Sequence, residues 1–173
     1  MRIIAGKWRS RIIDAPPGRN TRPTTDRVRE AWMSALQPEL PGSTVLDLFA
    51  GSGALGLEAL SRGATAVTFV ESGGPALRVL RGNIAKLGAE NTSVVKSDAL
   101  KYVRELEPFA FDLAVADPPY GQDFASTLIR LFLERPYAHM LSVEHGAAEI
   151  IPEADGARTR RYGDTAITTI PAP

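Results

Sequence analysis

The sequence predicts an α/β fold organised around a mostly parallel sheet. From position 44 onward, short apolar runs alternate with stretches of helical spacing, the pattern of repeated strand–helix units. A glycine-rich turn follows the first run, and acidic residues stand at or just beyond the ends of four runs. A chain of 173 residues is long enough to bury such a core as one domain.

Each expected element of this region has its own start or stop signal. Pro75 suits the first turn of a helix that Gly88 ends, and Arg62-Gly63 ends the helix before it. The expected strands cover residues 44–48, 66–70, 93–96 and 111–116. The expected helices cover residues 54–61, 75–87, 99–106 and 124–134. Because helices separate these strands, the strands are expected to run parallel.

The C-terminal part is less regular. Residues 158–162 and 165–170 flank Gly163-Asp164, which fits an antiparallel hairpin. Before this hairpin, a strand at 141–144 competes with one at 147–151, so the position of the sixth strand between Arg135 and Gly156 stays open.

The first 24 residues are expected to form a basic arm outside the main domain, which covers 25–173. Residues 1–6 and 8–14 interleave arginines with apolar residues, as in a small β-hairpin that turns at Gly6-Lys7. A helix is expected next, with Thr25 as its N-cap and with helical spacing of Val28, Ala31, Trp32, Ala35 and Leu36.

The composition excludes several classes of function. The chain has no cysteine and two histidines, which excludes thiolate chemistry and leaves no histidine cluster for a metal. No apolar run approaches the roughly 20 residues of a membrane helix, and the N-terminus lacks a signal-peptide core, so a cytoplasmic protein is expected. Net charge is zero, yet residues 1–29 hold eight cationic and two acidic side chains, which gives +6. A basic segment on an acidic body is typical of nucleic-acid binders.

A nucleoside cofactor is indicated by the segment Gly51-Ser-Gly53-Ala-Leu-Gly56, which lies between a strand and a helix. Glu71 ends the next strand, twenty residues after Gly51, where an acid would bind ribose hydroxyls. The pattern fits a dinucleotide as well as S-adenosylmethionine, because both contain an adenosine.

Asp47 favours S-adenosylmethionine over a dinucleotide. It stands within the first strand, where it would repel a pyrophosphate but attract the cationic amino and sulfonium groups of S-adenosylmethionine. A buried acid also needs a partner or ligand to offset its desolvation. Asp98 is placed either to accept hydrogen bonds from adenine or to cap the next helix, and both roles are compatible. Phe49 would also suit the core.

The tetrapeptide Asp117-Pro118-Pro119-Tyr120 follows the fourth strand and faces the same edge as the glycine loop. Two prolines fix the backbone and remove two N–H donors, which leaves carbonyl acceptors beside the carboxylate. An exocyclic amino group offers two donors to such a pair, so the tetrapeptide would aim the nitrogen at a methyl donor. Tyr120 would stack on the base, which must be extruded from its helix or loop.

With these residues assembled, the sequence resembles the bacterial 16S ribosomal RNA guanine-N2 methyltransferases over nearly its whole length. The segment 22–30, Arg-Pro-Thr-Thr-Asp-Arg-Val-Arg-Glu, resembles the signature that precedes the family's first helix. The segments 2–9, 47–63, 117–120 and 162–165 are similar to other parts of the family pattern. The resemblance implies a class I, Rossmann-like methyltransferase fold with seven strands, the last antiparallel, and a small N-terminal hairpin extension.

The resemblance also implies a function and its residues. S-adenosylmethionine would donate a methyl group to N2 of a guanine in 16S rRNA, within an assembled or partly assembled small subunit, by a monomeric protein without a metal. Asp117, Pro118 and Tyr120 would be catalytic. Cofactor binding would involve Asp47, Phe49, Ala50, Gly51, Ser52, Gly53, Gly56, Glu71, Asp98 and Ala99. RNA phosphates would be bound by Arg9, Arg11, Arg22, Arg27 and Arg29.

Three other functions fit part of this pattern. An amino-methyltransferase of adenine or cytosine in RNA or DNA would use the same tetrapeptide, although 173 residues leave no separate DNA-recognition domain. A non-catalytic nucleic-acid-binding domain is disfavoured by the intact acids and glycines. A nicotinamide-dependent oxidoreductase is disfavoured by Asp47 and by the lack of a Tyr-x-x-x-Lys pair for hydride transfer.

Overall fold

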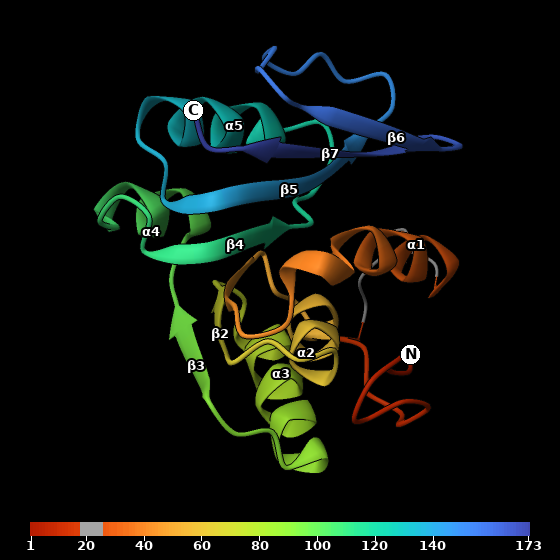
Figure 1. Cartoon of the computed structure of the whole chain (residues 1–173). Helices are drawn as coiled ribbons and strands as arrows, with labels where there is room; N and C mark the ends of the chain where they lie inside the picture. Colours follow the sequence, from red (N-terminus) through yellow and green to blue (C-terminus); the bar gives the residue numbers. More distant parts are fainter. Residues whose placement is uncertain (18–25) are drawn as a thin grey trace.

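The structure is a computed structural model, and it describes residues 1–17 and 26–173. Within them the strands form a seven-stranded sheet in the order β3-β2-β1-β4-β5-β7-β6 (Figure 1). The strands are β1 Thr44–Leu48, β2 Ala66–Glu71, β3 Thr92–Lys96, β4 Phe111–Ala116, β5 Ala138–Gly146, β6 Arg158–Tyr162 and β7 Thr165–Pro171. The helices are α1 Asp26–Leu36, the short 3-10 helix η1 Gln37–Glu39, α2 Ala54–Ser61, α3 Gly74–Leu87, α4 Ala99–Glu105 and α5 Phe124–Glu134.

Five strands run parallel, and β7 pairs antiparallel with both of its neighbours, β5 and β6. This is the seven-stranded, mostly parallel α/β sheet that the resemblance implies. The strand whose position the sequence leaves open, expected as the sixth, is the fifth along the chain, β5. It contains the expected 141–144 segment and begins three residues earlier. Residues 147–151 instead form a turn and loop that follow β5.

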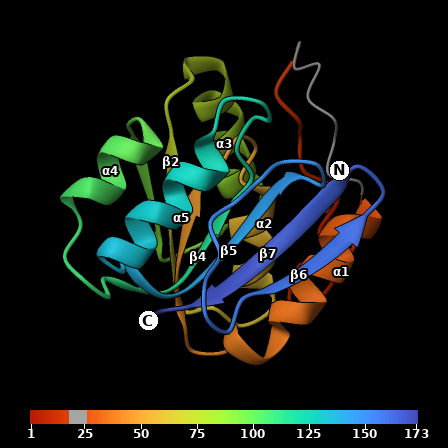
Figure 2. The same ribbon diagram turned by 90° about the horizontal axis from the view of Figure 1, so that it is seen from above.

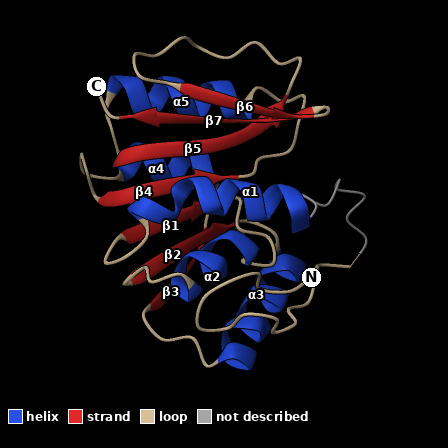
Figure 3. Cartoon of the chain, turned by 45° about the vertical axis from the view of Figure 1, so that its right-hand side comes forward, coloured by secondary structure: helices blue, strands red, loops and turns tan. Residues whose placement is uncertain are grey.

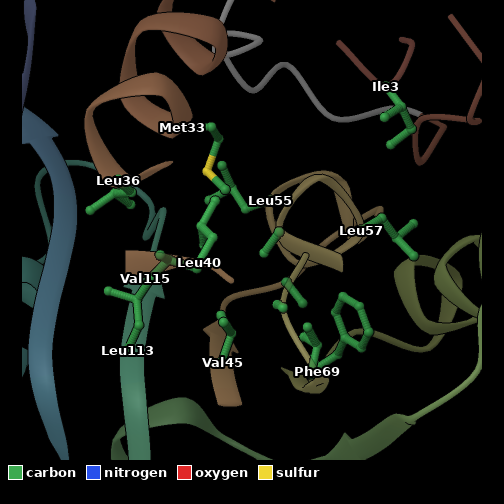
Figure 4. Close-up of a cluster of buried hydrophobic side chains, with 14 of the residues drawn as sticks. Ile3, Met33, Leu36, Leu40, Val45, Leu55, Leu57, Phe69, Leu113 and Val115 are labelled. Carbon is green, nitrogen blue, oxygen red and sulfur yellow. The ribbon is translucent and has the colours of Figure 1, made fainter. Parts of the chain in front are cut away.

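Helices cover both faces of the sheet because its central strands are apolar on both sides. Val45 and Leu113 face the cluster of α1, α2 and α3, whereas their neighbours Leu46 and Ala114 face the cluster of α4 and α5. Figures 2 and 3 show the helices divided between the two sides of the twisted sheet. Figure 4 shows the first cluster, in which Phe69 lies beneath α2. This two-sided burial holds the strand ends in fixed positions.

The first helix is confirmed, but its buried face is shifted. Trp32, Met33 and Leu36 are buried, while Ala35 is exposed although the spacing placed it on the apolar face. The Trp32 indole donates to the Ser142 hydroxyl at 2.7 Å, which fixes α1 on β5. The expected N-cap, Thr25, lies outside the described residues.

The N-terminal arm folds back antiparallel, with a single bridge between Arg2 and Ile12 in place of two full strands. The physical reason is that its backbone amides bond to α2. The amides of Ile4 and Ala5 donate to the buried Glu58 carboxylate at 2.9 and 3.0 Å. Further on, the amides of Lys7 and Trp8 donate to the carbonyl and the hydroxyl of Ser61.

Apolar side chains complete this docking. Ile3, Trp8 and Ile13 are buried and belong to the same core cluster as α1, α2 and α3. Gly6 makes the close approach possible, because it has a φ of 82° and an added Cβ would lie 1.8 Å from the Ser61 carbonyl oxygen. The described part of the arm, residues 1–17, therefore packs as a layer of the core.

Replacing Gly6→Ala should loosen the arm. Gly42→Ala is the matched control, because Gly42 has a φ of 76° but open space around its Cβ position. We expect Gly6→Ala to lower the free energy of unfolding by about 2 kcal/mol more than Gly42→Ala, since only the first change adds a clash with backbone. Chemical denaturation of both variants measures this difference, and equal losses would show that the contact with Ser61 contributes nothing.

Candidate active site at the β1–β4 crevice

The candidate site lies where the strand order reverses. From β1 the chain continues outward through β2 and β3, then returns to place β4 on the other side of β1. Helices leave on opposite faces at such a point, which opens a crevice beyond the carboxyl ends of the two strands. Asp47 of β1 is in register with Val115 of β4, two residues before Asp117. The pairing thus brings the two expected functional segments together.

Two carboxylates hold the glycine loop, residues 51–56, in place. Asp47, which is 1% exposed, accepts a hydrogen bond from the Gly56 amide at 2.9 Å. Glu71, at the end of β2, accepts from the amides of Gly51 and Gly73, each at 2.8 Å. Gly56 allows α2 to lie against β2, because an added Cβ would be 2.4 Å from the Phe69 ring. The loop is therefore shaped before any ligand arrives.

Three carboxylates gather at this edge, and the charges of two of them act on the third, Asp47. Burial raises the pKa of Asp47 well above its usual value; the Gly56 hydrogen bond opposes this shift, and the charges of Asp117 and Glu71 add to it. A cation placed among these groups would relieve their repulsion and the cost of burying Asp47. The electrostatics therefore favour a positively charged ligand and disfavour a pyrophosphate.

Phe49 adds backbone strain at the same place. Its φ of 57° lies in the left-handed region, which is uncommon for a bulky residue and concentrates at functional sites. Its ring is half-buried and lies 5.1 Å from the Phe124 ring, centroid to centroid. The ring thus belongs partly to the core, as the sequence allowed, and Ala50, Ser52 and Gly53 complete the buried turn beside it.

Asp98 caps α4, and its carboxylate accepts from the Lys101 amide at 2.8 Å. The capping role that the sequence offered is therefore present. Ala99, the first residue of α4, is buried. A contact of either residue with adenine stays a prediction.

In the tetrapeptide, Asp117 is half-buried, Pro118 is buried, and Tyr120 is fixed by its hydroxyl. That hydroxyl donates to Glu144 of β5 at 2.7 Å and lies 2.9 Å from the Thr165 hydroxyl of β7. Burial raises the pKa of Tyr120 above its usual value, and the Glu144 carboxylate adds to this shift, so the hydroxyl keeps its proton. Its ring is therefore held at a constant place beside Asp117.

The five expected RNA-binding arginines do not share one environment. Arg9, Arg11 and Arg27 are exposed, and Arg11 donates to the Lys86 carbonyl at 2.9 Å. Arg22 lies outside the described residues. Arg29 corrects the expectation, because it is 2% exposed and its guanidinium bonds to the Arg2 carbonyl and the Asp26 carboxylate. Arg29 therefore joins α1 to the arm and is not available to a phosphate.

Sequence reasoning missed the side chains that support the site from a distance. Asn83 of α3 donates to the carbonyls of Ser52, in the glycine loop, and Asp14, in the arm, each at 2.9 Å. Glu144 and Thr165 hold Tyr120 from strands that come later in the chain. No local motif marks these residues. The one signal that could have found Asn83 is its helical spacing with Leu80 and Leu87 on the apolar face of α3.

Known proteins with similar structures and sequences include methyltransferases. The putative methyltransferase yhhF from Escherichia coli has a TM-score of 0.84 and 34% identity, over 98% of this chain and 96% of that one. A curated Escherichia coli protein, ribosomal RNA small subunit methyltransferase D, is 40% identical over 131 residues, which are 76% of this chain and 66% of the relative. The putative rRNA methyltransferase YlbH of Bacillus subtilis is 33% identical over 96% of both chains.

Fold and site together define a class I, Rossmann-like methyltransferase, the class whose methyl donor is S-adenosylmethionine. The family described as conserved hypothetical protein 95 matches residues 1–170. The chain belongs to that family.

In residues 1–17 and 26–173, no helix is long and apolar enough to cross a membrane, and no group of three or more histidine or acidic side chains could hold a metal ion.

S-adenosylmethionine fits the residues that are present. Its cationic sulfonium and amino groups suit an edge where the charges of Glu71 and Asp117 add to the raised pKa of the buried Asp47. Carboxylate oxygens can accept more than one hydrogen bond each, so Glu71 can bond to ribose hydroxyls while it holds the loop. Asp47 and the backbone of 49–53 would lie nearest the amino acid end of the cofactor, and Glu71 nearest its ribose.

Asp47→Asn should change how stability depends on pH. A buried acid whose pKa is raised binds its proton more tightly in the folded state, so the stability of the cofactor-free protein falls as pH rises from about 4 toward that raised pKa. Asparagine keeps an acceptor for Gly56 but does not titrate. We expect the Tm of Asp47→Asn, measured relative to the native protein, to rise between pH 4 and pH 7.

The same variant should bind S-adenosylmethionine at least about tenfold more weakly, because a charged hydrogen-bonding partner is lost. Asp98→Asn is the control for the Tm series, since Asp98 is exposed. Parallel curves of Tm against pH for Asp47→Asn and the native protein would mean that folding does not raise the pKa of Asp47.

Proposed function

We propose that this protein transfers a methyl group from S-adenosylmethionine to the exocyclic N2 amine of a guanine in 16S rRNA of the small ribosomal subunit. The observation that carries the proposal is that Asp117 lies close enough to Asp47 for their charges to interact, with the Tyr120 hydroxyl fixed by Glu144. The rRNA substrate is supported by relatives named ribosomal RNA small subunit methyltransferase D and putative rRNA methyltransferase.

The chemistry follows from the acceptors at this edge. The Asp117 carboxylate accepts one N–H of the amino group, and a carbonyl of the proline pair accepts the other, which orients the nitrogen lone pair toward the cofactor pocket. S-adenosylmethionine, when bound, supplies an electrophilic methyl group there. The bond between the methyl carbon and the sulfonium would break as the bond to nitrogen forms, so that a neutral thioether leaves. The nitrogen would give up one proton, and the Asp117 carboxylate would receive it. Tyr120 presents an anchored ring on which the base stacks.

The arm supplies the electrostatic attraction for the RNA in this proposal. Arg9, Arg11 and Arg27 are exposed on or next to the described arm, and each neutralises a phosphate without reading sequence. Three acidic residues, Asp47, Glu71 and Asp117, gather instead at the crevice, where the cofactor and the target amine bind. This separation of charge keeps the catalytic carboxylates away from the RNA backbone.

Asp117→Asn should separate catalysis from cofactor binding. The amide keeps one acceptor but cannot take up a proton, so we expect methyl transfer to fall at least about a hundredfold. The affinity for S-adenosylmethionine should change less than about threefold. The assay uses tritiated S-adenosylmethionine with small subunits from a strain that lacks this activity, followed by identification of the labelled nucleoside.

The labelled product decides between the proposal and its alternatives. Label in N2-methylguanine supports the proposed reaction. Label in N6-methyladenine or in DNA would replace it with another amino-methyltransferase, and cofactor binding without any transfer would favour a non-catalytic binding domain. Loss of cofactor binding in Asp117→Asn would assign that residue to the cofactor and not to the amine.

The combined variant Arg9→Gln, Arg11→Gln, Arg27→Gln should bind RNA more weakly and with a smaller dependence on salt. Each neutralised contact reduces the slope of log affinity against log salt by about 0.7 to 0.9. Arg104 and Arg130, which are exposed on α4 and α5, provide a control of the same kind on the opposite face. If the control variant weakened binding equally, the arm would have no special role.

A further inference from the structure

A cavity of about 750 Å³ opens next to the catalytic tetrapeptide, on the side of β5, β6 and β7. Tyr120 and Gly121 form one wall, the turn 146–149 forms a second, and Arg161 and Asp164 of the last hairpin form a third. Its volume lies within the roughly 300 to 1,000 Å³ typical of ligand pockets. The elements that bind the cofactor, the glycine loop and the end of β2, do not line it. Because Tyr120 belongs to both the tetrapeptide and the cavity, the cavity adjoins the site of methyl transfer.

The walls of this cavity are fixed by hydrogen bonds across the chain. The Glu149 carboxylate accepts from the Gly121 amide at 3.0 Å and from the Gly146 amide at 2.8 Å, which ties the tetrapeptide turn to the end of β5. The Ala147 amide donates to the Asp164 carbonyl at 2.8 Å, which ties the same turn to the last hairpin. The cavity is therefore preformed, and a ligand would not need to order it.

Arg161 contributes a positive charge to this wall. It is exposed on β6, the outermost strand, and its guanidinium makes no hydrogen bond or ion pair with any residue in the described ranges. A guanidinium presents a planar set of donors that matches the oxygens of a phosphate. The acidic residues Glu149 and Asp164 also line the cavity, where a carboxylate suits the ring N–H of a guanine, next to its amine.

A structural explanation of Arg161 also exists. Charged side chains on an edge strand prevent it from pairing with another chain, and β6 carries Arg158, Arg160 and Arg161 together. Side chains alternate along a strand, so Arg158 and Arg160 face one side while Arg161 faces the other. Of the three, only Arg161 lines the cavity. If the arginines only protect the edge, all three should contribute alike. If a ligand binds in the cavity, Arg161 should matter more than the other two.

We propose that this cavity receives the nucleotide that is to be methylated, and that the Arg161 guanidinium binds the phosphate of that nucleotide. The inference rests on the proposed function, because it takes the target to be a nucleotide of RNA. In this arrangement the base stacks against the Tyr120 ring with its amino group toward Asp117. Arg161 sets how deeply the nucleotide enters, and it acts after the arm has captured the RNA.

The first test compares Arg161→Gln with Arg160→Gln, which removes the same charge from the same exposed strand. With small subunits from a strain lacking this activity, we expect Arg161→Gln to raise the KM for the particle at least about tenfold. Arg160→Gln should change KM less than about threefold, and both variants should bind S-adenosylmethionine like the native protein. Equal effects of the two substitutions on KM would overturn the proposal in favour of a general charge effect of β6.

The second test does not depend on methyl transfer. Guanosine 5′-monophosphate and guanosine are titrated into the full-length protein with S-adenosylhomocysteine, and the amide signals of Gly121, Gly146 and Ala147 are followed by NMR. We expect the monophosphate to shift these signals and to bind at least about tenfold more weakly to Arg161→Gln, while guanosine binds both proteins equally. If these amides do not respond, or if Arg161→Gln leaves the monophosphate affinity unchanged, the cavity proposal is wrong. A native protein that methylates no particle would count against the proposed function alone.

Discussion

The pairing of β1 with β4 is the constraint on which the rest of the structure depends. These strands are distant in sequence, yet their parallel register places Asp47 close to Asp117. A slip of one residue would turn Asp47 toward α4 and α5 and away from the glycine loop, since neighbouring side chains face opposite sides of a sheet. The apolar residues on both faces prevent that slip, because it would move each of them to the wrong face. Packing in the core thus determines the geometry of the chemistry.

The three acids at this edge lower the stability of the folded protein, and their role in binding explains why they are there. Asp47 is buried beside Glu71 and Asp117, an arrangement that disfavours charge in the absence of a cation. The amide of Gly56 donates to Asp47, and the amides of Gly51 and Gly73 donate to Glu71. Natural proteins keep such local conflicts mainly at sites of binding or catalysis, because the ligand resolves them.

The sequence could predict what depends on neighbours along the chain and not what depends on distant contacts. The ranges of β4 and α5 were predicted to the residue, because apolar runs and turn signals bound them. The arm was expected as two strands, but Glu58 takes two of its amides and leaves a single bridge. Arg29 resembled its basic neighbours, and only the packing of α1 against the arm buries it. Arg161 likewise lines a cavity with Tyr120 only because the fold brings β6 near the tetrapeptide, which the local sequence does not reveal.

Asn83 has a consequence for how the two substrates influence each other. Its side-chain amide, fully buried, bonds to Asp14 of the arm and to Ser52 of the glycine loop at once. Any movement of the arm that removes Asp14 leaves this amide incompletely bonded, and the resulting penalty changes the energy of the loop. Thermodynamic linkage then requires reciprocity: whatever RNA does to cofactor affinity through this amide, the cofactor does equally to RNA affinity. In the proposed function, this asparagine thereby couples the affinity for the cofactor to the affinity for the RNA.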